Sequence, residues 1–190
     1  MKKVGENPPA RFPDRPIAEA PQPWWVAKVK PRMEKALAFD FLNTGTEYYL
    51  PLYTHVIRRR DNNKPRKSIL PLFPGYIAFS MTTPHNIFIT GRVVNIVEVR
   101  HQKRFVRELT QIQSALEKGV VVEPCDTAFE IGQTVEVHAG PLRGLVGVVA
   151  RIRDSDRLVL SVDGLGRAMV TIEPAYLRPV KRKEGDDEAR

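Results

Sequence analysis

Short runs of β-branched and apolar residues, separated by glycine and aspartate turns, dominate the last third of this 190-residue chain. Residues 129–180 contain TVEVH, LVGVVARI, RLVLSV and RAMVTI, none of which is long enough to form a helix with a periodic apolar face. With a final AYLRPV, these runs predict a five-stranded barrel. The glycines between the runs are expected at turn and bulge positions of a strongly curved sheet.

Phosphate binding is a competing interpretation of the glycine-rich stretch GPLRGLVG, residues 140–147. A phosphate loop places Gly-Lys-Ser/Thr after its last glycine and then a helix, whereas Gly147 is followed by Val148 and a strand pattern. Cys125 is the single cysteine and lacks the paired spacing of a zinc site. The chain also lacks clustered His–x–His or Asp–x–Asp pairs in its basic part. We therefore expect no metal, no cofactor and no enzymatic activity.

Residues 24–118 mix strand and helix patterns. WWVAKV predicts a strand, a helix is expected from about Pro31 to Gly45, and apolar residues at helical spacing predict a second helix that ends near Gly119. Between the helices, EYYLPLYTHVIRRR and KSILPLFPGYIAFS predict a hairpin, and VVNIVEV predicts a further strand. This order indicates an α+β fold, an antiparallel sheet with flanking helices.

Composition predicts where the two folded domains begin and end. Six prolines and no apolar periodicity predict a disordered leader at residues 1–23. Residues 119–128 are expected to be a linker and 181–190 a charged tail. No apolar window has the length of a membrane span, and no signal peptide is evident. We expect a cytoplasmic monomer that does not bind membranes.

Net positive charge is concentrated in one half of the chain. Residues 24–122 carry 16 Lys/Arg against 7 Asp/Glu, while residues 129–180 carry six of each. Such asymmetry is typical of proteins that contact a polyanion, although a solvated basic surface is the alternative. Two clusters would supply the phosphate contacts. The first comprises Lys28, Lys30, Arg32 and Lys35, and the second comprises Arg58, Arg59, Arg60, Lys64, Arg66 and Lys67.

Two groups of segments resemble the NusG family of transcription elongation factors. PWWVAKVKPRMEKALAFDFL followed by YYLPLY and PLFPGYIAF is similar to the family's N-terminal domain, and FEIGQTVEVHAGPLRGLVGVV with VLSVDGLGR and VTIEPAYLRPV resembles its SH3-like KOW barrel. The resemblance covers residues 24–180. It implies an N-terminal domain (24–118) that binds the clamp helices of bacterial RNA polymerase and a barrel (129–180) that recruits a second partner.

The resemblance also assigns residues. It places Phe73 and Tyr76 in the apolar depression that binds polymerase, with Trp25 and Ile96 as weaker neighbours; burial in the core is the alternative for Phe73, Tyr76 and Trp25. It directs the first basic cluster toward the non-template DNA strand. The second cluster, in the hairpin, has a solvated charged turn as its alternative.

In the barrel, the resemblance implies a partner-binding loop that contains Leu142, Arg143 and Leu145. Here Leu142 and Leu145 are either exposed anchors or buried residues that close the loop. Housekeeping family members carry aromatic residues in this loop, which help to engage the termination factor Rho and a small-subunit ribosomal protein. The leucines, with the longer SVDGLGR, resemble specialised antiterminators of long operons. The alternatives are a housekeeping factor that couples to Rho, or a ribosome-associated RNA-binding protein, whose barrel should be basic and not neutral.

Overall fold

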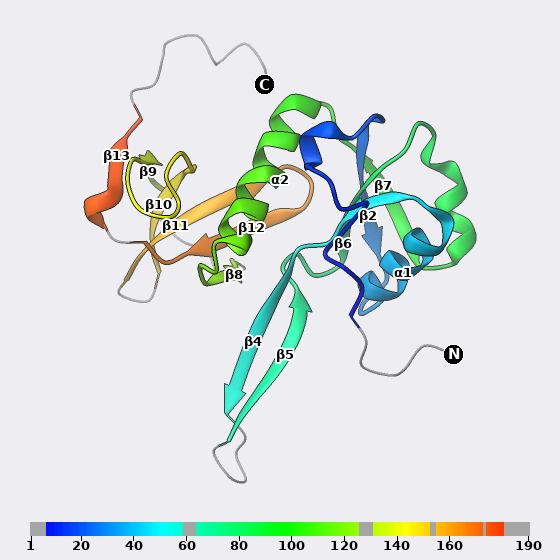
Figure 1. The fold of residues 1–190 in the computed structure, drawn as a ribbon, viewed down its shortest axis with the longest axis horizontal. Coiled ribbons are helices and arrows are strands. Elements are labelled where there is room, and N and C mark those ends of the chain that lie inside the picture. Colours follow the sequence, from blue (N-terminus) through cyan, green and yellow to red (C-terminus); the bar gives the residue numbers. More distant parts are fainter. Residues whose placement is uncertain (1–6, 59–63, 126–130, 153–154, 173, 181–190) are drawn as a thin grey trace.

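A computed structural model describes residues 7–58, 64–125, 131–152, 155–172 and 174–180. It contains an N-terminal α+β region followed by a C-terminal all-β region, and the predicted fold class is confirmed (Figure 1). Helix α2 lies between the sheets of the two regions. The charged tail, residues 181–190, lies outside the described residues.

The N-terminal region is built on a five-stranded antiparallel sheet with the order β1-β3-β6-β2-β7. Its strands are β1 (Arg11–Phe12), β2 (Trp24–Val29), β3 (Glu47–Tyr49), β6 (Tyr76–Ser80) and β7 (Val93–Glu98). Side chains of β2 alternate between the faces: Trp24 and Val26 belong to one apolar cluster, Ala27 and Val29 to the other. Both faces of the sheet are therefore covered.

Helix α1 (Glu34–Thr44) covers the face to which Ala27 points, through the buried Leu37 and Phe41. The sequence predicted a start near Pro31, but the helix begins three residues later. Arg32 has a φ of +65°, a conformation that no α-helix contains, so the chain turns there before the helix starts. The helix ends as predicted at Gly45, whose φ of +69° suits a left-handed cap.

Helix α2 (Gln102–Glu117) covers the opposite face. Phe105, Leu109 and Ile112 recur at spacings of four and three residues, which puts them on one side of the helix, and all three are fully buried. Gly119, with a φ of +69°, follows the helix end at the predicted place. A short 3₁₀ helix, η2 (Pro84–Thr90), precedes β7.

Prolines divide each of the two long strand-like runs into two strands. Pro51 separates β3 from β4 (Leu52–Arg58), and Pro74 lies between β5 (Pro65–Pro71) and β6. Among the described strands, β4 and β5 pair only with each other, and they form a two-stranded ribbon that projects away from both regions (Figure 1). The loop at the far end of the ribbon, residues 59–63, lies outside the described residues.

The leader differs from its expected disorder. Strand β1 pairs with β3 at the edge of the sheet, and η1 (Ile17–Glu19) places Ile17 against α2 with only 3% of its surface exposed. Arg15 forms a bidentate ion pair with Glu47 at 2.6 and 3.1 Å. The free energy of these contacts offsets the conformational entropy that the segment loses when it becomes ordered. Residues 1–6 lie outside the described residues.

The C-terminal region is a six-stranded antiparallel sheet with the order β13-β9-β10-β11-β12-β8. Its strands are β8 (Val122–Pro124), β9 (Ile131–Val137), β10 (Val146–Ile152), β11 (Ser155–Val162), β12 (Gly166–Val170) and β13 (Leu177–Pro179), with η3 (Pro174–Tyr176) before the last. Strand β8 lies inside the stretch expected to be a linker and pairs with β12. Gly147 is required in β10, because a Cβ atom there would lie 2.6 Å from the carbonyl oxygen of Val159 on the neighbouring strand β11.

Candidate functional site

The turn between β5 and β6 presents the two aromatic residues that the sequence singled out. Glu34, at the start of α1, is 6% exposed, and its Oε1 accepts a hydrogen bond of 2.7 Å from the N–H of Gly75. Gly75 has a φ of +84°, so the turn requires glycine at this position. A buried carboxylate and a left-handed glycine therefore hold the segment from Phe73 to Tyr76 in one conformation. Sequence analysis did not identify Glu34, because its role depends on its position next to the Gly75 turn in the folded protein, which no local sequence pattern indicates.

Phe73 is only 3% exposed, and the C-terminal region lies against it. A Cβ atom placed on Gly166 would lie 3.3 Å from Cδ1 of Phe73. Phe73 also belongs to one continuous apolar cluster that joins Leu109 of α2 to Leu158 and Leu165 of the C-terminal region. The aromatic face expected to bind polymerase is therefore covered within the chain. Tyr76 remains half-buried at the edge of this contact.

The structure does not bring Trp25 and Ile96 onto this face. Both pack against the cluster under α1, on the other side of the sheet, and Trp25 Nε1 donates a hydrogen bond of 2.9 Å to the carbonyl oxygen of Met81. Because side chains alternate along a strand, the next residue, Val97, lies on the Phe73 side. A Cβ atom on Gly164 would lie 3.7 Å from Cγ1 of Val97 and 3.6 Å from Cγ2 of Val26. Sequence analysis missed both valines.

Two polar contacts accompany the apolar one. The N–H of Asp163 donates to Glu108 Oε2 at 2.9 Å, and the N–H of Val146 donates to Gln111 Oε1 at 3.3 Å. Arg104 Nε donates to the second oxygen of Glu108 at 2.8 Å, and this hydrogen bond and the carboxylate charge raise the pKa of Arg104. Residues of α2 thus bind two separate turns of the C-terminal region.

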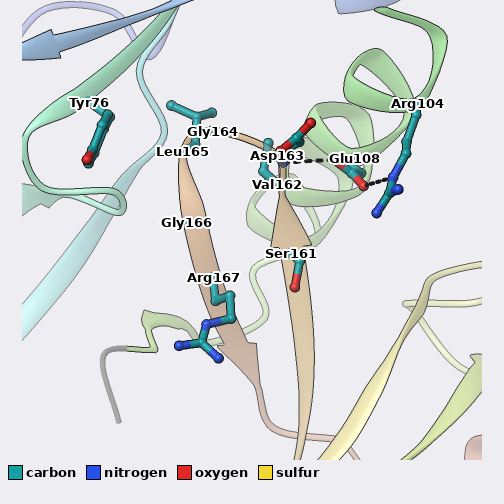
Figure 2. Close-up of a pocket in the computed structure, with 10 residues that line it drawn as sticks. All are labelled: Tyr76, Arg104, Glu108, Ser161, Val162, Asp163, Gly164, Leu165, Gly166 and Arg167. Carbon is teal, nitrogen blue, oxygen red and sulfur yellow. Dashed lines mark hydrogen bonds and ion pairs between the residues drawn. The ribbon is translucent and has the colours of Figure 1, made fainter. Parts of the chain in front are cut away.

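A shallow cleft of about 550 Å³ follows the edge of this contact (Figure 2). Tyr76 borders it on one side, and Arg104 with Glu108 on the other. The β11–β12 turn (Asp163–Leu165) lies between them. Leu165, in this turn, is 4% exposed. The β11–β12 turn, which belongs to the stretch SVDGLGR, is therefore one of the segments that meet the N-terminal region.

The loop between β9 and β10 differs from the exposed-anchor expectation. Leu142 and Leu145 are 2% and 4% exposed and pack in the shared apolar cluster, because a tight turn with Gly144 at a φ of +90° directs both side chains inward. Arg143 is exposed and borders a second shallow cleft with His138. Among the three candidate partner-binding residues, only Arg143 presents its side chain to solvent in this arrangement.

The first basic cluster divides into exposed and engaged members. Lys28, Lys30 and Arg32 are exposed around the end of β2. Lys35 Nζ donates to Asn7 Oδ1 at 2.7 Å and to the carbonyl oxygen of Ile69, and burial lowers the pKa of Lys35. Lys35 therefore ties α1 to the base of the ribbon, and three residues of the cluster remain available to phosphates.

The second basic cluster lies on the ribbon. Arg58, at the end of β4, is exposed, as are Lys64, Arg66 and Lys67. The candidates Arg59 and Arg60 lie outside the described residues. In the part of the chain that the structure describes, no three His, Cys, Asp or Glu side chains come together as a metal site would need, and no helix there is long and apolar enough to cross a membrane.

A family model described as "Transcription termination factor nusG" matches residues 22–118. This match spans the five-stranded sheet from β2 onward, both α-helices, the Phe73–Tyr76 turn and the ribbon. A search of curated proteins found no match.

Proposed function

The chain belongs to the NusG family of transcription factors, and from that premise we propose that it is an elongation and antitermination factor that binds the clamp helices of bacterial RNA polymerase through the face around Phe73 and Tyr76. The observation that carries this proposal is the rigid aromatic turn held by Glu34 within the matched region. A preordered apolar surface loses little entropy on binding. Val26 and Val97 extend the same face.

The covered state of this face adds a step to the proposed mechanism. Polymerase and the β11–β12 turn would compete for Phe73, so the C-terminal region must move away before polymerase binds. The apparent affinity is then the intrinsic affinity reduced by the fraction of molecules that are open. Once bound, the factor would favour the elongating state of polymerase by binding it more tightly than the paused state.

The exposed part of the first basic cluster supplies the proposed DNA contact. Lys28, Lys30 and Arg32 would neutralise phosphates of the non-template strand. Lys28 lies directly across from Tyr76 in the β2–β6 register, which places one cation beside the proposed polymerase contact. Polymerase and the displaced strand would therefore be bound next to each other, where β2 ends and β6 begins.

For the released C-terminal region we propose the role of a KOW module that recruits a small-subunit ribosomal protein or Rho. Leu142 and Leu145 replace the family's aromatic loop residues, which favours a specialised antiterminator that acts on a few long operons over a general factor. The protein would act as a cytoplasmic, non-enzymatic monomer. A ribosome-associated RNA-binding protein is the second candidate, and the electroneutral C-terminal region argues against it.

The test is a polymerase-binding measurement on Phe73→Ala and Tyr76→Ala, with folding checked by circular dichroism. Loss of a central aromatic anchor should weaken binding by about 2 kcal/mol, or about 30-fold. Ile96→Ala is the matched control, because it removes apolar area from the opposite face of the same sheet. If the folded Phe73 and Tyr76 variants bind as the unmodified protein does, the proposed face is wrong; co-purification with ribosomes in place of polymerase would favour the second candidate.

A further inference from the structure

The β4–β5 ribbon is built differently from every other pair of strands that the structure describes. Its seven residue pairs, from Leu52↔Pro71 to Arg58↔Pro65, form a sheet of their own. At about 3.4 Å per residue the ribbon is about 20 Å long, and it projects from the body of the protein (Figure 1). An isolated two-stranded ribbon is only marginally stable in water, so a partner that binds the ribbon would stabilise it.

The ribbon leaves β-branched side chains in water. Val56, Ile57 and Ile69 are 52%, 50% and 41% exposed. Exposed apolar residues on strands with open edges favour aggregation unless a partner or nearby charge protects them. Arg58, Lys64, Arg66 and Lys67 supply that charge, and the described residues of the ribbon contain no carboxylate. The partner is therefore expected to be polyanionic with apolar contact points.

The register sorts these side chains onto two faces. Ile57 lies opposite Arg66, and His55 opposite Ser68, so one face combines a guanidinium, an imidazole, a hydroxyl and a methyl-bearing chain. This set supplies hydrogen-bond donors and acceptors for base edges and an apolar contact for a thymine methyl group. Lys67, the next residue on its strand, points to the other face, and its long side chain would reach phosphates at the rim of the groove.

The shape of the ribbon selects among nucleic acids. Proteins bind single-stranded nucleic acid by stacking successive bases on a series of aromatic side chains. In the ribbon, Tyr53 and His55 lie together in the half near the body, in edge contact with ring centroids 6.1 Å apart. The described distal half contains no aromatic side chain, so the ribbon lacks such a series there. The major groove of B-form DNA, about 12 Å wide, admits a two-stranded ribbon, whereas the major groove of A-form RNA is too narrow for side chains to read. The positive charge of the ribbon, its width and the chemistry of its side chains all favour duplex DNA as the ligand.

We propose that the β4–β5 ribbon is a duplex DNA-binding element that enters the major groove with the face formed by His55, Ile57, Arg66 and Ser68. Lys67 and Arg58 then contact the flanking phosphates. This site is separate from the Phe73 face and from the exposed lysines at the end of β2, and it does not depend on polymerase binding.

The first experiment measures binding of the full-length protein to a fluorescent 20-base-pair DNA duplex over a range of salt concentrations. Replacement of Arg58, Arg66 and Lys67 by Gln should make the slope of log K against log salt shallower by about 0.9 for each of the two lost phosphate contacts, those of Arg58 and Lys67, so by about 1.8 in total. Replacement of Lys103, Arg107 and Lys118 by Gln is the matched control, because it removes the same charge from exposed positions on and beside α2. Equal losses in the two triple variants would show a non-specific charge effect and overturn the proposal.

The second experiment tests the groove. Methylation of guanine N7, which lies in the major groove, should interfere with binding of the unmodified protein, and Arg66→Gln should lose that interference while Lys67→Gln keeps it. Interference that is absent, or binding that is tighter to single-stranded DNA or duplex RNA of the same sequence, would refute the groove assignment. Because polymerase is absent from both assays, failure of the proposed polymerase face would not affect either result.

Discussion

Glu108 offers the most direct way to open the contact between the two regions. Its carboxylate is 11% exposed and is the acceptor for the N–H of Asp163, while its other oxygen binds Arg104 within α2. Only the first of these bonds crosses between the regions. We therefore predict that Glu108→Ala shifts the molecule toward an open state without unfolding either region.

The magnitude follows from the kind of hydrogen bond that is lost. A bond to a charged group contributes about 1.5–3 kcal/mol, which corresponds to a shift of about 10- to 150-fold in the ratio of open to closed molecules. The Arg104–Glu108 pair at i, i+4 adds only about 0.2–0.5 kcal/mol to helix stability, so α2 should survive its loss. While the closed state dominates, polymerase affinity should rise by the same factor as the open fraction.

Two measurements check this prediction. Small-angle scattering should give a larger radius of gyration for Glu108→Ala, and polymerase binding should become tighter. Glu108→Gln keeps an acceptor oxygen, so its radius of gyration and its polymerase affinity should lie between those of Glu108→Ala and of the unmodified protein. Gln113→Ala is the control, because the amide of Gln113 donates within α2, to Glu117 Oε1 at 2.7 Å. Unchanged scattering together with unchanged affinity in Glu108→Ala would refute the view that the C-terminal region restricts access.

Further predictions concern stability. Tyr48→Phe should cost about 1 kcal/mol of unfolding free energy, because the Tyr48 hydroxyl donates to the carbonyl oxygen of Pro9 at 2.9 Å; Tyr49→Phe should cost nothing or stabilise, because the buried Tyr49 hydroxyl has no hydrogen-bond partner among the described residues. Burial raises the pKa of Tyr48 to about 12 and raises the pKa of Tyr49 further, so both tyrosines ionise in the unfolded chain at a lower pH than in the folded protein. The free energy of unfolding should therefore fall as pH rises from 10 toward 12, by up to about 1.4 kcal/mol per pH unit for each tyrosine. Urea denaturation at several pH values measures this fall. Glu34→Ala should lower stability by about 1–3 kcal/mol by leaving the Gly75 N–H unpaired, whereas Glu34→Gln should lose less; equal losses would contradict the role of that acceptor.

Local patterns predicted the local structure well. Glycine caps at Gly45 and Gly119 and the apolar spacing of α2 depend on residues close in sequence, and both helices end where predicted. The leader shows the limit of such patterns. Its prolines predict disorder from composition alone, yet the N–H of Leu50 donates to the carbonyl oxygen of Ala10 at 2.7 Å and Ile17 is buried against α2. Those partners are distant in sequence, so no local signal indicates them.

The arrangement of the candidate site residues differs from the one that the sequence predicted. Resemblance singled out the Phe73–Tyr76 turn, but it grouped Trp25 and Ile96 with Phe73 although strand alternation puts them on the opposite face. The error is one residue in β7, where Val97 and not Ile96 shares the face of Phe73. The cover over Phe73 depends on Gly166, about 90 residues later, and no periodicity within either region specifies a contact between them.

The two proposed binding surfaces differ in accessibility, and this difference predicts the order in which DNA and polymerase bind. Phe73 is 3% exposed beneath the C-terminal region, while Ile57 on the ribbon is 50% exposed in the same structure. A ligand shifts a conformational equilibrium only by its differential affinity for the two states, and the ribbon pairs with neither region. DNA bound to the ribbon should therefore leave the closed state populated, so the protein can be held at DNA before its polymerase-binding face is uncovered. Opening must come from a partner that competes for Phe73 or for the β11–β12 turn.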